Sequence, residues 1–430
     1  MFKIYIETYG CTLNKADSEI MKSLLVKKGY VITNNIEEAN VIIINTCTVR
    51  KDSESKMVKR LKKLRKYLNN GYKIIVAGCM AKAQPYLVSR LIPEASLVSP
   101  QNIDRICYVV ESRERVVLLD GERSTSVVPS TIIGVIGIVP IADGCLNDCS
   151  FCIVKLARGR LRSYPPKLIV KTIDELVKKG AKEIEITAQD TAAYGRDLFE
   201  KIRLPDLVNM ICEIDEDFMI RIGQMNPQWM LDIIDDLVES LKDPKVYKYL
   251  HIPVQSGDNR VLEIMKRGYR VEDFEYIVHY LRSKIPNIQI ATDIIVGHPG
   301  EDEDAFRNTL DLVTRIEPDK VHLAQYSIRP RTEAAAMPQI PEIIKKQRCK
   351  VLEEVIEKIG LDINKEYIGT KAKALITEKG FRPGSVVARL YNYKPVVIKK
   401  ELPLGKWVEV EIEKATFFDL RTSKATITEN

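Results

Sequence analysis

The chain has 430 residues, of which 45% are hydrophobic and 29% are charged. This composition describes a globular protein and excludes a disordered or fibrous one, and the length predicts two or three domains. The net charge of +7 is compatible with a polyanionic partner but does not establish one. The longest apolar stretch, residues 131–142, is shorter than the roughly 20 residues that a membrane span requires, so we expect no membrane association.

The first ten residues are typical of a β-strand and lack the basic and apolar regions of a secretion signal. We therefore expect a cytoplasmic protein. In a reducing compartment, nine cysteines indicate metal binding or catalysis rather than disulfides.

Three short β-rich runs near the start of the chain each end close to a cysteine, namely Cys11, Cys47 and Cys79. Amphipathic helices are predicted between them at residues 14–29 and 52–70. The β-α-β-α-β alternation predicts a parallel sheet, whose strands all end at one edge. We therefore expect the three cysteines to converge on one site. Taken singly, each is also compatible with a small buried hydrophobic residue.

The second predicted helix carries seven Lys and Arg residues across positions 56–66. A solvated helix face is the default interpretation of such a run, and contact with RNA is the alternative.

A charged, turn-rich segment at residues 113–130 predicts a linker that follows a first domain of residues 1–112. Beyond it, strand-like and helical stretches alternate. Strands are predicted at residues 131–142, 184–189, 218–223, 249–255, 288–297 and 321–328. Six β/α units predict an open (β/α)6 partial barrel over residues 131–366, with its active site at the carboxyl ends of the strands.

Cys145, Cys149 and Cys152 form a C-x3-C-x2-C run directly after the first of these strands. Soft thiolates select zinc or iron–sulfur iron, and three cysteines without a nearby histidine match closed tetrahedral zinc poorly. A four-iron cluster with one open iron fits better. A structural metal knuckle or a group of buried thiols is the alternative.

Short alternating strands punctuated by turn residues fill residues 367–430. They predict a small all-β barrel of the OB-like type, which is a common nucleic-acid platform. The expected fold is therefore α/β, with an N-terminal parallel-sheet domain, a partial barrel and this C-terminal barrel.

Together these features resemble, over the whole chain, the methylthiotransferase family of radical S-adenosylmethionine (SAM) enzymes. The motifs that carry the resemblance are ETYGCTLNKADSE, NTCTVR, AGCMA, GCLNDCSFC, RGRLRSYP, HIPVQSGDNRVLEIMKR and ATDIIVGHPGE. The blocks ARGRLRSYP and AQDTAAYGRD are most similar to the archaeal and eukaryotic branch, which modifies N6-threonylcarbamoyladenosine in tRNA.

The resemblance implies a methylthiotransferase domain, a radical SAM domain and a TRAM RNA-binding domain, with SAM and two [4Fe-4S] clusters as cofactors. The SAM-cleaving cluster would be held by Cys145, Cys149 and Cys152. The auxiliary cluster, which carries sulfur, would be held by Cys11, Cys47 and Cys79.

Further contacts follow from the same resemblance. The residues expected to contact SAM are Phe151, Gln189, Gln255, Val296 and Gly297. The substrate carries a carboxylate, for which arginine is the expected partner. The candidates for that contact are Arg158, Arg329 and Arg331.

The implied activity is methylthiolation of C2 of N6-threonylcarbamoyladenosine at position 37 of tRNA, by SAM-dependent radical chemistry. The implied partners are tRNA, an electron donor and a sulfur source, and the sequence identifies neither of the last two. A monomer is our working expectation. The chain departs from the family pattern at His298, where Phe is common, and in RPRTEAA, where RPGTPAA is usual.

Three alternatives remain at this point. The target could be isopentenyladenosine in tRNA or an aspartate of a ribosomal protein. The protein could instead be an iron–sulfur redox protein, which SAM cleavage under reducing conditions would exclude. It could also be an RNA-binding module with a structural metal, which iron and sulfide analysis would exclude.

Overall fold

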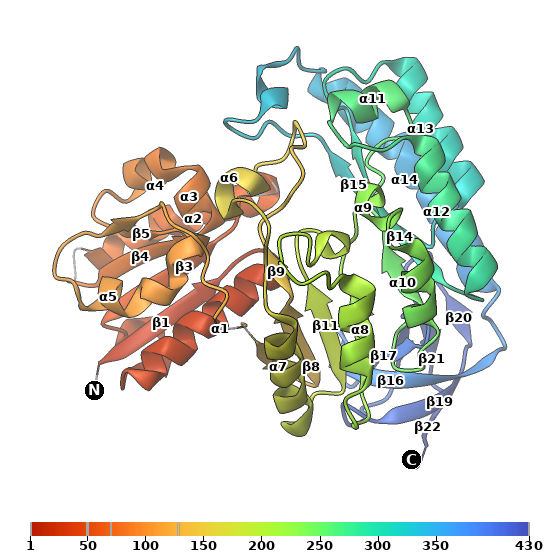
Figure 1. Cartoon of the computed structure of the whole chain (residues 1–430), viewed down its shortest axis with the longest axis horizontal. Coiled ribbons are helices and arrows are strands. Elements are labelled where there is room, and N and C mark those ends of the chain that lie inside the picture. The colour runs from red at the N-terminus through yellow and green to blue at the C-terminus, as the bar shows by residue number, and fades with distance from the viewer. Residues whose placement is uncertain (1, 49–50, 69–70, 127, 129, 429–430) are drawn as a thin grey trace.

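The computed structural model describes residues 2–48, 51–68, 71–126, 128 and 130–428. Parts of the predicted features therefore lie outside the described residues. These parts are the end of the NTCTVR motif at 49–50, the end of the second helix at 69–70, positions 127 and 129 of the linker, and the last two residues. The N-terminal unit lies beside the barrel, and the C-terminal sheet lies against one end of the barrel (Figure 1).

The N-terminal unit contains a parallel sheet in the order β2-β1-β3-β4-β5-β6. Its strands are β1 (Lys3–Thr8), β2 (Val31–Thr33), β3 (Val41–Thr46), β4 (Lys73–Gly78), β5 (Ser96–Val98) and β6 (Val117–Leu118). β3 is buried along its whole length, as expected of a central parallel strand with helices on both faces. β6 lies inside the predicted linker, so this sheet extends beyond residue 112.

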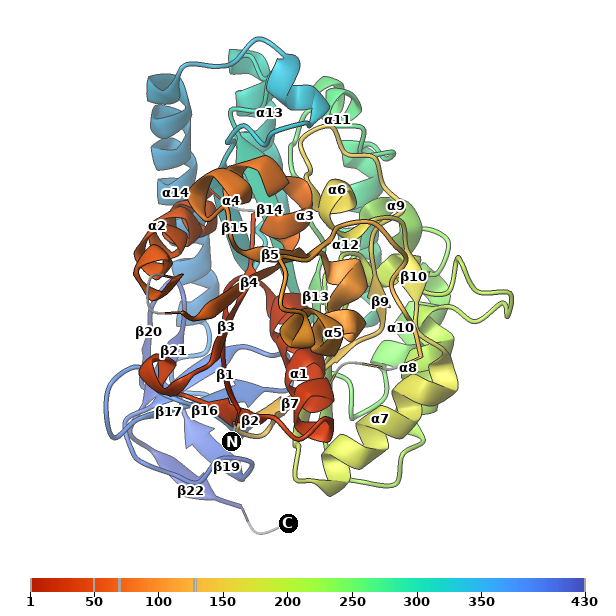
Figure 2. The same cartoon turned by 90° about the vertical axis from the view of Figure 1, so that its left-hand side faces the viewer.

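Helices cover both faces of the sheet, as Figures 1 and 2 show. They are α1 (Thr12–Lys27), η1 (Ile36–Glu38), α2 (Lys51–Leu68), α3 (Cys79–Ala83), α4 (Pro85–Leu91), η2 (Pro100–Arg105) and α5 (Ile106–Glu111). Successive side chains of β3 enter two separate cores. Ile42 and Ile44 pack with residues of α2, whereas Ile43 packs with residues of α1 and α5.

The first predicted barrel segment, residues 131–142, is a hairpin rather than one strand. Its arms are β7 (Thr131–Ile133) and β8 (Ile136–Pro140), which pair antiparallel. Gly134 turns the chain between them with a φ of +63°, which glycine adopts without strain. After β8, β9 (Ala142–Asp143) pairs with β10 (Arg162–Ser163), and the loop between these two strands carries the C-x3-C-x2-C run.

The prediction of a partial barrel is confirmed. Its strands are β8, β11 (Glu183–Thr187), β12 (Met219–Ile222), β13 (Tyr249–His251), β14 (Gln289–Val296) and β15 (Lys320–Gln325). β8, β11 and β12 pair in parallel, as do β13, β14 and β15. A parallel bridge between Ile220 and Val246 connects the two groups of strands.

Helices surround the outside of the barrel strands (Figure 1). The helices of this part are α6 (Val154–Arg158), α7 (Pro166–Lys178), η3 (Thr191–Ala193), α8 (Leu204–Cys212), α9 (Pro227–Met230), α10 (Ile234–Leu241), α11 (Asn259–Ile264), α12 (Val271–Lys284), α13 (Glu303–Ile316), η4 (Glu333–Ala336) and α14 (Glu342–Lys365). Among the described residues, no helix is both long enough and apolar enough to cross a membrane.

The C-terminal part is a curled, largely antiparallel sheet in the order β20-β21-β18-β17-β16-β19-β22, which confirms the predicted OB-like fold. Its strands are β16 (Lys371–Lys379), β17 (Val386–Leu390), β18 (Pro395–Ile398), β19 (Trp407–Glu411), β20 (Lys414–Ala415), β21 (Leu420–Thr422) and β22 (Ala425–Ile427). Leu375 of β16 is buried with Tyr249 and Ala291 of the barrel, so this sheet closes the end opposite to the carboxyl ends of the strands.

A buried carboxyl group lies at that closed end. Glu183 of β11 is fully buried and accepts hydrogen bonds from the hydroxyl groups of Tyr247, at 3.2 Å, and Tyr393, at 3.0 Å. Burial, reinforced by the charge of Glu185, raises the pKa of Glu183 from 4.5 to about 7. The hydrogen bond between Glu183 and Tyr393 thus connects the barrel to the C-terminal part of the chain, through a carboxyl group whose pKa is near neutrality.

Glu183→Gln is expected to flatten the pH dependence of stability. Because the folded protein holds this proton more tightly than the unfolded chain, wild-type stability falls as pH rises from 4.5 to about 7. The amide of the variant does not titrate, so the variant lacks this decrease in the free energy of unfolding. In the wild type the decrease reaches about 3 kcal/mol above neutrality. Thermal unfolding from pH 4.5 to 8 would measure it, with the exposed Glu213→Gln as control. Parallel pH profiles for E183Q and wild type would contradict the assignment.

Candidate active site at the domain junction

The first three cysteines of the chain lie at the carboxyl edge of the N-terminal sheet. Cys47 and Cys79 directly follow β3 and β4, which are neighbours, and Cys11 follows β1, which pairs with β3 on its other side. Thr46 pairs in register with Gly78, so the residues after them leave the sheet side by side. The structure therefore brings together three loops whose cysteines are 36 and 32 positions apart in the sequence.

Asn14 connects these three cysteine loops. Its side-chain nitrogen donates to the carbonyl oxygens of Tyr9, at 2.7 Å, and Thr46, at 2.9 Å, which lie in the loops of Cys11 and Cys47. Its side-chain oxygen accepts from the thiol of Cys79 at 3.7 Å. The motif that contains Asn14 was recognised in the sequence, but a positioning role for this residue was not.

Cys145, Cys149 and Cys152 lie in the loop between β9 and β10. Gly144 begins this loop with a φ of +77°, and a Cβ atom there would lie 2.0 Å from the carbonyl oxygen of Arg160. Only glycine fits this close approach of two backbone segments. Burial raises the pKa of Cys145 to about 11 and that of Cys152 to about 12. A metal would therefore have to displace their protons as it binds.

Arg267 contacts the middle cysteine of this run. Its guanidinium group is buried and donates to the sulfur of Cys149 at 3.2 Å and to the carbonyl oxygen of Pro253 at 3.0 Å. Hydrogen bonds to ligand sulfurs are one of the means by which proteins tune iron–sulfur clusters. Arg267 ends the HIPVQSGDNRVLEIMKR motif, and no role was predicted for it.

The two cysteine triads are linked through packed helices. α3 begins at Cys79, and α6 begins two residues after Cys152. Cys79 and Ala83 of the first segment form a buried apolar cluster with Ile153 and Ala157 of the second. The N-terminal sheet and the barrel therefore meet where each carries its triad.

A buried ion-pair network crosses the same junction. Arg158 donates to both carboxylate oxygens of Asp143, at 3.0 Å each, to Asp17 at 2.8 Å and to Asn14 at 2.7 Å. Arg123 donates to Asp17 at 2.8 Å and lies 3.6 Å from Asp143. Burial alone would raise the pKa of Asp143, but the charges of Arg158 and Arg123 more than offset this and hold it below its usual value.

The three arginines predicted to bind a substrate carboxylate differ in their surroundings. Arg158 is part of the buried network just described. Arg329 is also buried, and it donates to Glu54 at 2.8 Å and to the carbonyl oxygen of Thr48 at 3.1 Å. Arg331 is exposed, and its side chain makes no hydrogen bond or ion pair with the described residues. Of the three, Arg331 therefore has the guanidinium group most available to a ligand.

Two of the predicted SAM contacts carry buried oxygens without a partner. The side-chain oxygens of Gln189 and Gln255 are both buried and accept no hydrogen bond within the described structure. Gln255 also has a φ of +73°, which is unusual for a residue other than glycine. A buried acceptor without a partner lowers the stability of the folded state unless a ligand donates a hydrogen bond to it. Val296 is buried at the end of β14, and Gly297 follows with a φ of +78°.

Phe151 and His298 pack together, which explains the departure from the family pattern. Their ring centroids lie 5.9 Å apart in an edge-to-face arrangement, and Tyr326 contacts His298 in the same way at 5.2 Å. Burial lowers the pKa of His298 to about 4, so this imidazole is neutral near pH 7. It therefore fills an aromatic position as the more common Phe would.

Comparison with known families matches three successive parts of the chain. Residues 3–99 match the uncharacterized protein family UPF0004, residues 139–313 match the radical SAM superfamily, and residues 365–424 match the TRAM domain. The structure of the radical SAM methyltransferase TsrM from Kitasatospora setae has a TM-score of 0.61 at 11% identity, and covers 78% of this chain and 75% of that one. That likeness shows a shared fold. The protein is thus a radical SAM protein with UPF0004 and TRAM domains.

Full-length relatives define the family. A probable threonylcarbamoyladenosine tRNA methylthiotransferase of Pyrococcus abyssi is 41% identical over 97% of this chain and 98% of its own length. The protein of the same name from Pyrococcus horikoshii is 40% identical over 96% of this chain and 97% of its own length. The threonylcarbamoyladenosine tRNA methylthiotransferase of Homo sapiens is 37% identical, over 95% of this chain and 72% of its own length. The chain belongs to the threonylcarbamoyladenosine tRNA methylthiotransferase family, as the motifs predicted.

Arg158→Met is expected to destabilise the protein by about 3 kcal/mol or more, because it leaves Asp17 and Asp143 buried with one cation between them. Arg331→Met, at an exposed position, should change stability by less than about 0.5 kcal/mol. Chemical denaturation of both variants would measure the difference. Unchanged stability of R158M together with weakened substrate binding would instead support the role predicted from the sequence.

Proposed function

We propose that the protein methylthiolates C2 of N6-threonylcarbamoyladenosine at position 37 of tRNA and thereby forms the 2-methylthio derivative. The observation that carries the proposal is the meeting of two cysteine triads at the junction of the N-terminal sheet and the barrel. The names of the full-length relatives support the choice of substrate. A single-cluster redox protein would have no need of a second triad.

The chemistry of the donor sets fits two iron–sulfur clusters. Each triad supplies three thiols, so a four-iron cluster bound there keeps one iron for an external ligand. Cys145, Cys149 and Cys152 would hold the SAM-cleaving cluster. Cys11, Cys47 and Cys79 would hold the auxiliary cluster. When bound, the first supplies the electron that cleaves SAM to a 5′-deoxyadenosyl radical, and the second supplies the sulfur.

The chain's own residues orient these groups. Gly144 and Asn14 fix the backbones of the cysteine loops, and Arg267 donates to the sulfur of Cys149. The unpaired oxygens of Gln189 and Gln255 would accept hydrogen bonds from SAM, and Phe151 would pack against its adenine. Val296 and Gly297 would complete the SAM site at the end of β14.

Substrate contacts follow from charge and exposure. Arg331 would bind the carboxylate of the threonylcarbamoyl group, because a guanidinium group can hold a carboxylate in two hydrogen bonds. The tRNA backbone would lie along the exposed basic residues of α2 and on the C-terminal sheet. The basic residues exposed on α2 are Lys56, Lys59, Lys62, Lys63, Arg65 and Lys66. Arg60 of the same helix is instead paired with Glu7.

We keep the predicted domain boundaries as part of the proposal. The methylthiotransferase domain would comprise residues 1–112, followed by a linker at 113–130 whose strand β6 completes the sheet of that domain. The radical SAM domain would comprise residues 131–366 and the TRAM domain residues 367–430.

Replacing one triad at a time should separate the two chemical roles. Anaerobically reconstituted wild-type protein should hold about eight iron atoms per chain, because two triads each complete a four-iron cluster. Ala at positions 145, 149 and 152 should halve the iron and abolish the formation of 5′-deoxyadenosine. Ala at positions 11, 47 and 79 should also halve the iron but preserve SAM cleavage.

A matched control is Ala at positions 107, 212 and 349, which are cysteines outside both triads. This variant should retain the full iron content. Formation of 5′-deoxyadenosine by the 145/149/152 variant would contradict the assignment of the SAM-cleaving site.

The activity itself can be tested in a host strain that lacks its own tRNA methylthiotransferases. Expression of this chain should produce 2-methylthio-N6-threonylcarbamoyladenosine, measured by mass spectrometry of digested tRNA, and C145A should produce none. If the methylthio group appeared on isopentenyladenosine or on a ribosomal protein instead, the proposed substrate would be wrong, while the radical SAM assignment would stand.

A further inference from the structure

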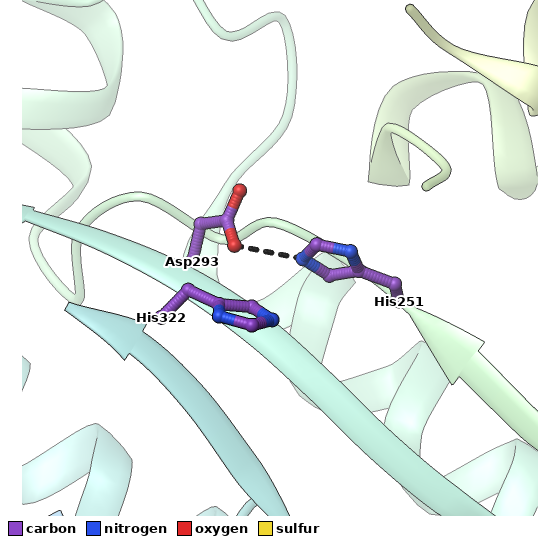
Figure 3. Close-up of side chains that lie close together, drawn as sticks. All are labelled: His251, Asp293 and His322. Carbon is purple, nitrogen blue, oxygen red and sulfur yellow. Dashed lines mark hydrogen bonds and ion pairs between the residues drawn. The ribbon is translucent and has the colours of Figure 1, made fainter. Parts of the chain in front are cut away.

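Two histidines and an aspartate from neighbouring barrel strands meet in the structure (Figure 3). His251 ends β13, Asp293 lies within β14 and His322 lies within β15. His251 pairs in register with Ala291, and Asp293 with His322. Because successive side chains of a strand alternate between faces, Ala291 and Asp293 share a face. All three polar side chains therefore project from the same face of the β13-β14-β15 sheet.

That face is the inside of the barrel. Tyr249 and Ala291, each two positions before a member of the group, are buried in the cluster that the C-terminal sheet closes. Leu250 and Ile294 point the opposite way, into the core beneath the surrounding helices. The group thus lies above the closed end of the barrel and below the carboxyl rim, where Val296 ends β14.

The spacing of the three residues is suited to a metal ion. Their ligand atoms all lie within 4.8 Å of one another, and all three residues are partly exposed. His251 Nε2 lies 2.7 Å from Asp293 Oδ1, and the two imidazole centroids are 5.1 Å apart. Ligand atoms about 2.0–2.1 Å from a zinc ion are about 3 Å or slightly more from one another. Small rotations of these side chains would therefore allow an ion to replace the hydrogen bond.

We propose that His251, Asp293 and His322 form a third metal site, which binds a divalent first-row transition ion such as Zn2+ inside the barrel. Two imidazoles and a carboxylate suit borderline ions of this kind, whereas magnesium and calcium take oxygen ligands. Three protein ligands leave a coordination position for water on the side of the barrel interior. The proposal is independent of the methylthiolation proposed above, because none of its ligands is a cysteine.

Zinc binding can be measured on the full chain after anaerobic reconstitution with iron and sulfide. The reconstituted protein would be incubated with Zn2+ and desalted, and its metals would be quantified. Wild type should retain about one zinc per chain more than His322→Ala, since two remaining ligands hold zinc weakly. His279→Ala, on the exposed face of α12, is the matched control and should bind as wild type does.

The coordination shell distinguishes this site from the cysteine triads. X-ray absorption at the zinc edge of the wild-type protein should show nitrogen and oxygen at about 2.0–2.1 Å and no sulfur at about 2.3 Å. Zinc should also raise the thermal unfolding midpoint of wild type but not that of H322A. Equal zinc retention by wild type and H322A, or a sulfur shell in wild type, would overturn the proposal.

Discussion

The contact on which the rest of the structure depends is the buried guanidinium group of Arg158. Arg158 is the last residue of α6 and directly follows Ala157, which packs against Cys79 of α3. Its guanidinium group holds Asp143 of the barrel side together with Asp17 and Asn14 of the N-terminal unit. Buried charges are tolerated only when they are paired and hydrogen-bonded. In this arrangement the buried charges of the network are paired, and the segments that carry Cys79 and Cys152 lie side by side.

Contacts within each unit also hold the loops that carry its three cysteines. Asn14 connects the three N-terminal loops, and the close approach of Gly144 to Arg160 closes the loop of the second triad. Burial raises the pKa of Cys79 and Cys152 to about 12 and that of Cys145 to about 11, so these three thiols are protonated near neutrality. A metal bound there would have to displace their protons. The loops are shaped by the side-chain hydrogen bonds of Asn14 and by the tight turn at Gly144.

The two ends of the barrel differ in the polar groups that they carry and in what covers them. At the carboxyl ends of the strands, the side-chain oxygens of Gln189 and Gln255 accept no hydrogen bond from the described residues. The opposite end is covered by the C-terminal sheet, and Glu183 of the barrel accepts a hydrogen bond from Tyr393 there. His251, Asp293 and His322 lie between the two ends. A ligand at the rim would thus lie above an interior that holds polar groups, because the strands place every second side chain inside.

The sequence by itself determined the order of the elements, the six β/α units and the family, because strand periodicity and cysteine motifs are local signals. It predicted the convergence of Cys11, Cys47 and Cys79 because parallel strands end at one edge. Tertiary structure alone decided the partners of each side chain. Arg158 was expected at a substrate and lies in a buried ion-pair network, and the grouping of His251 with His322 joins residues 71 positions apart. Such contacts depend on strand register and domain packing, which local sequence patterns do not encode.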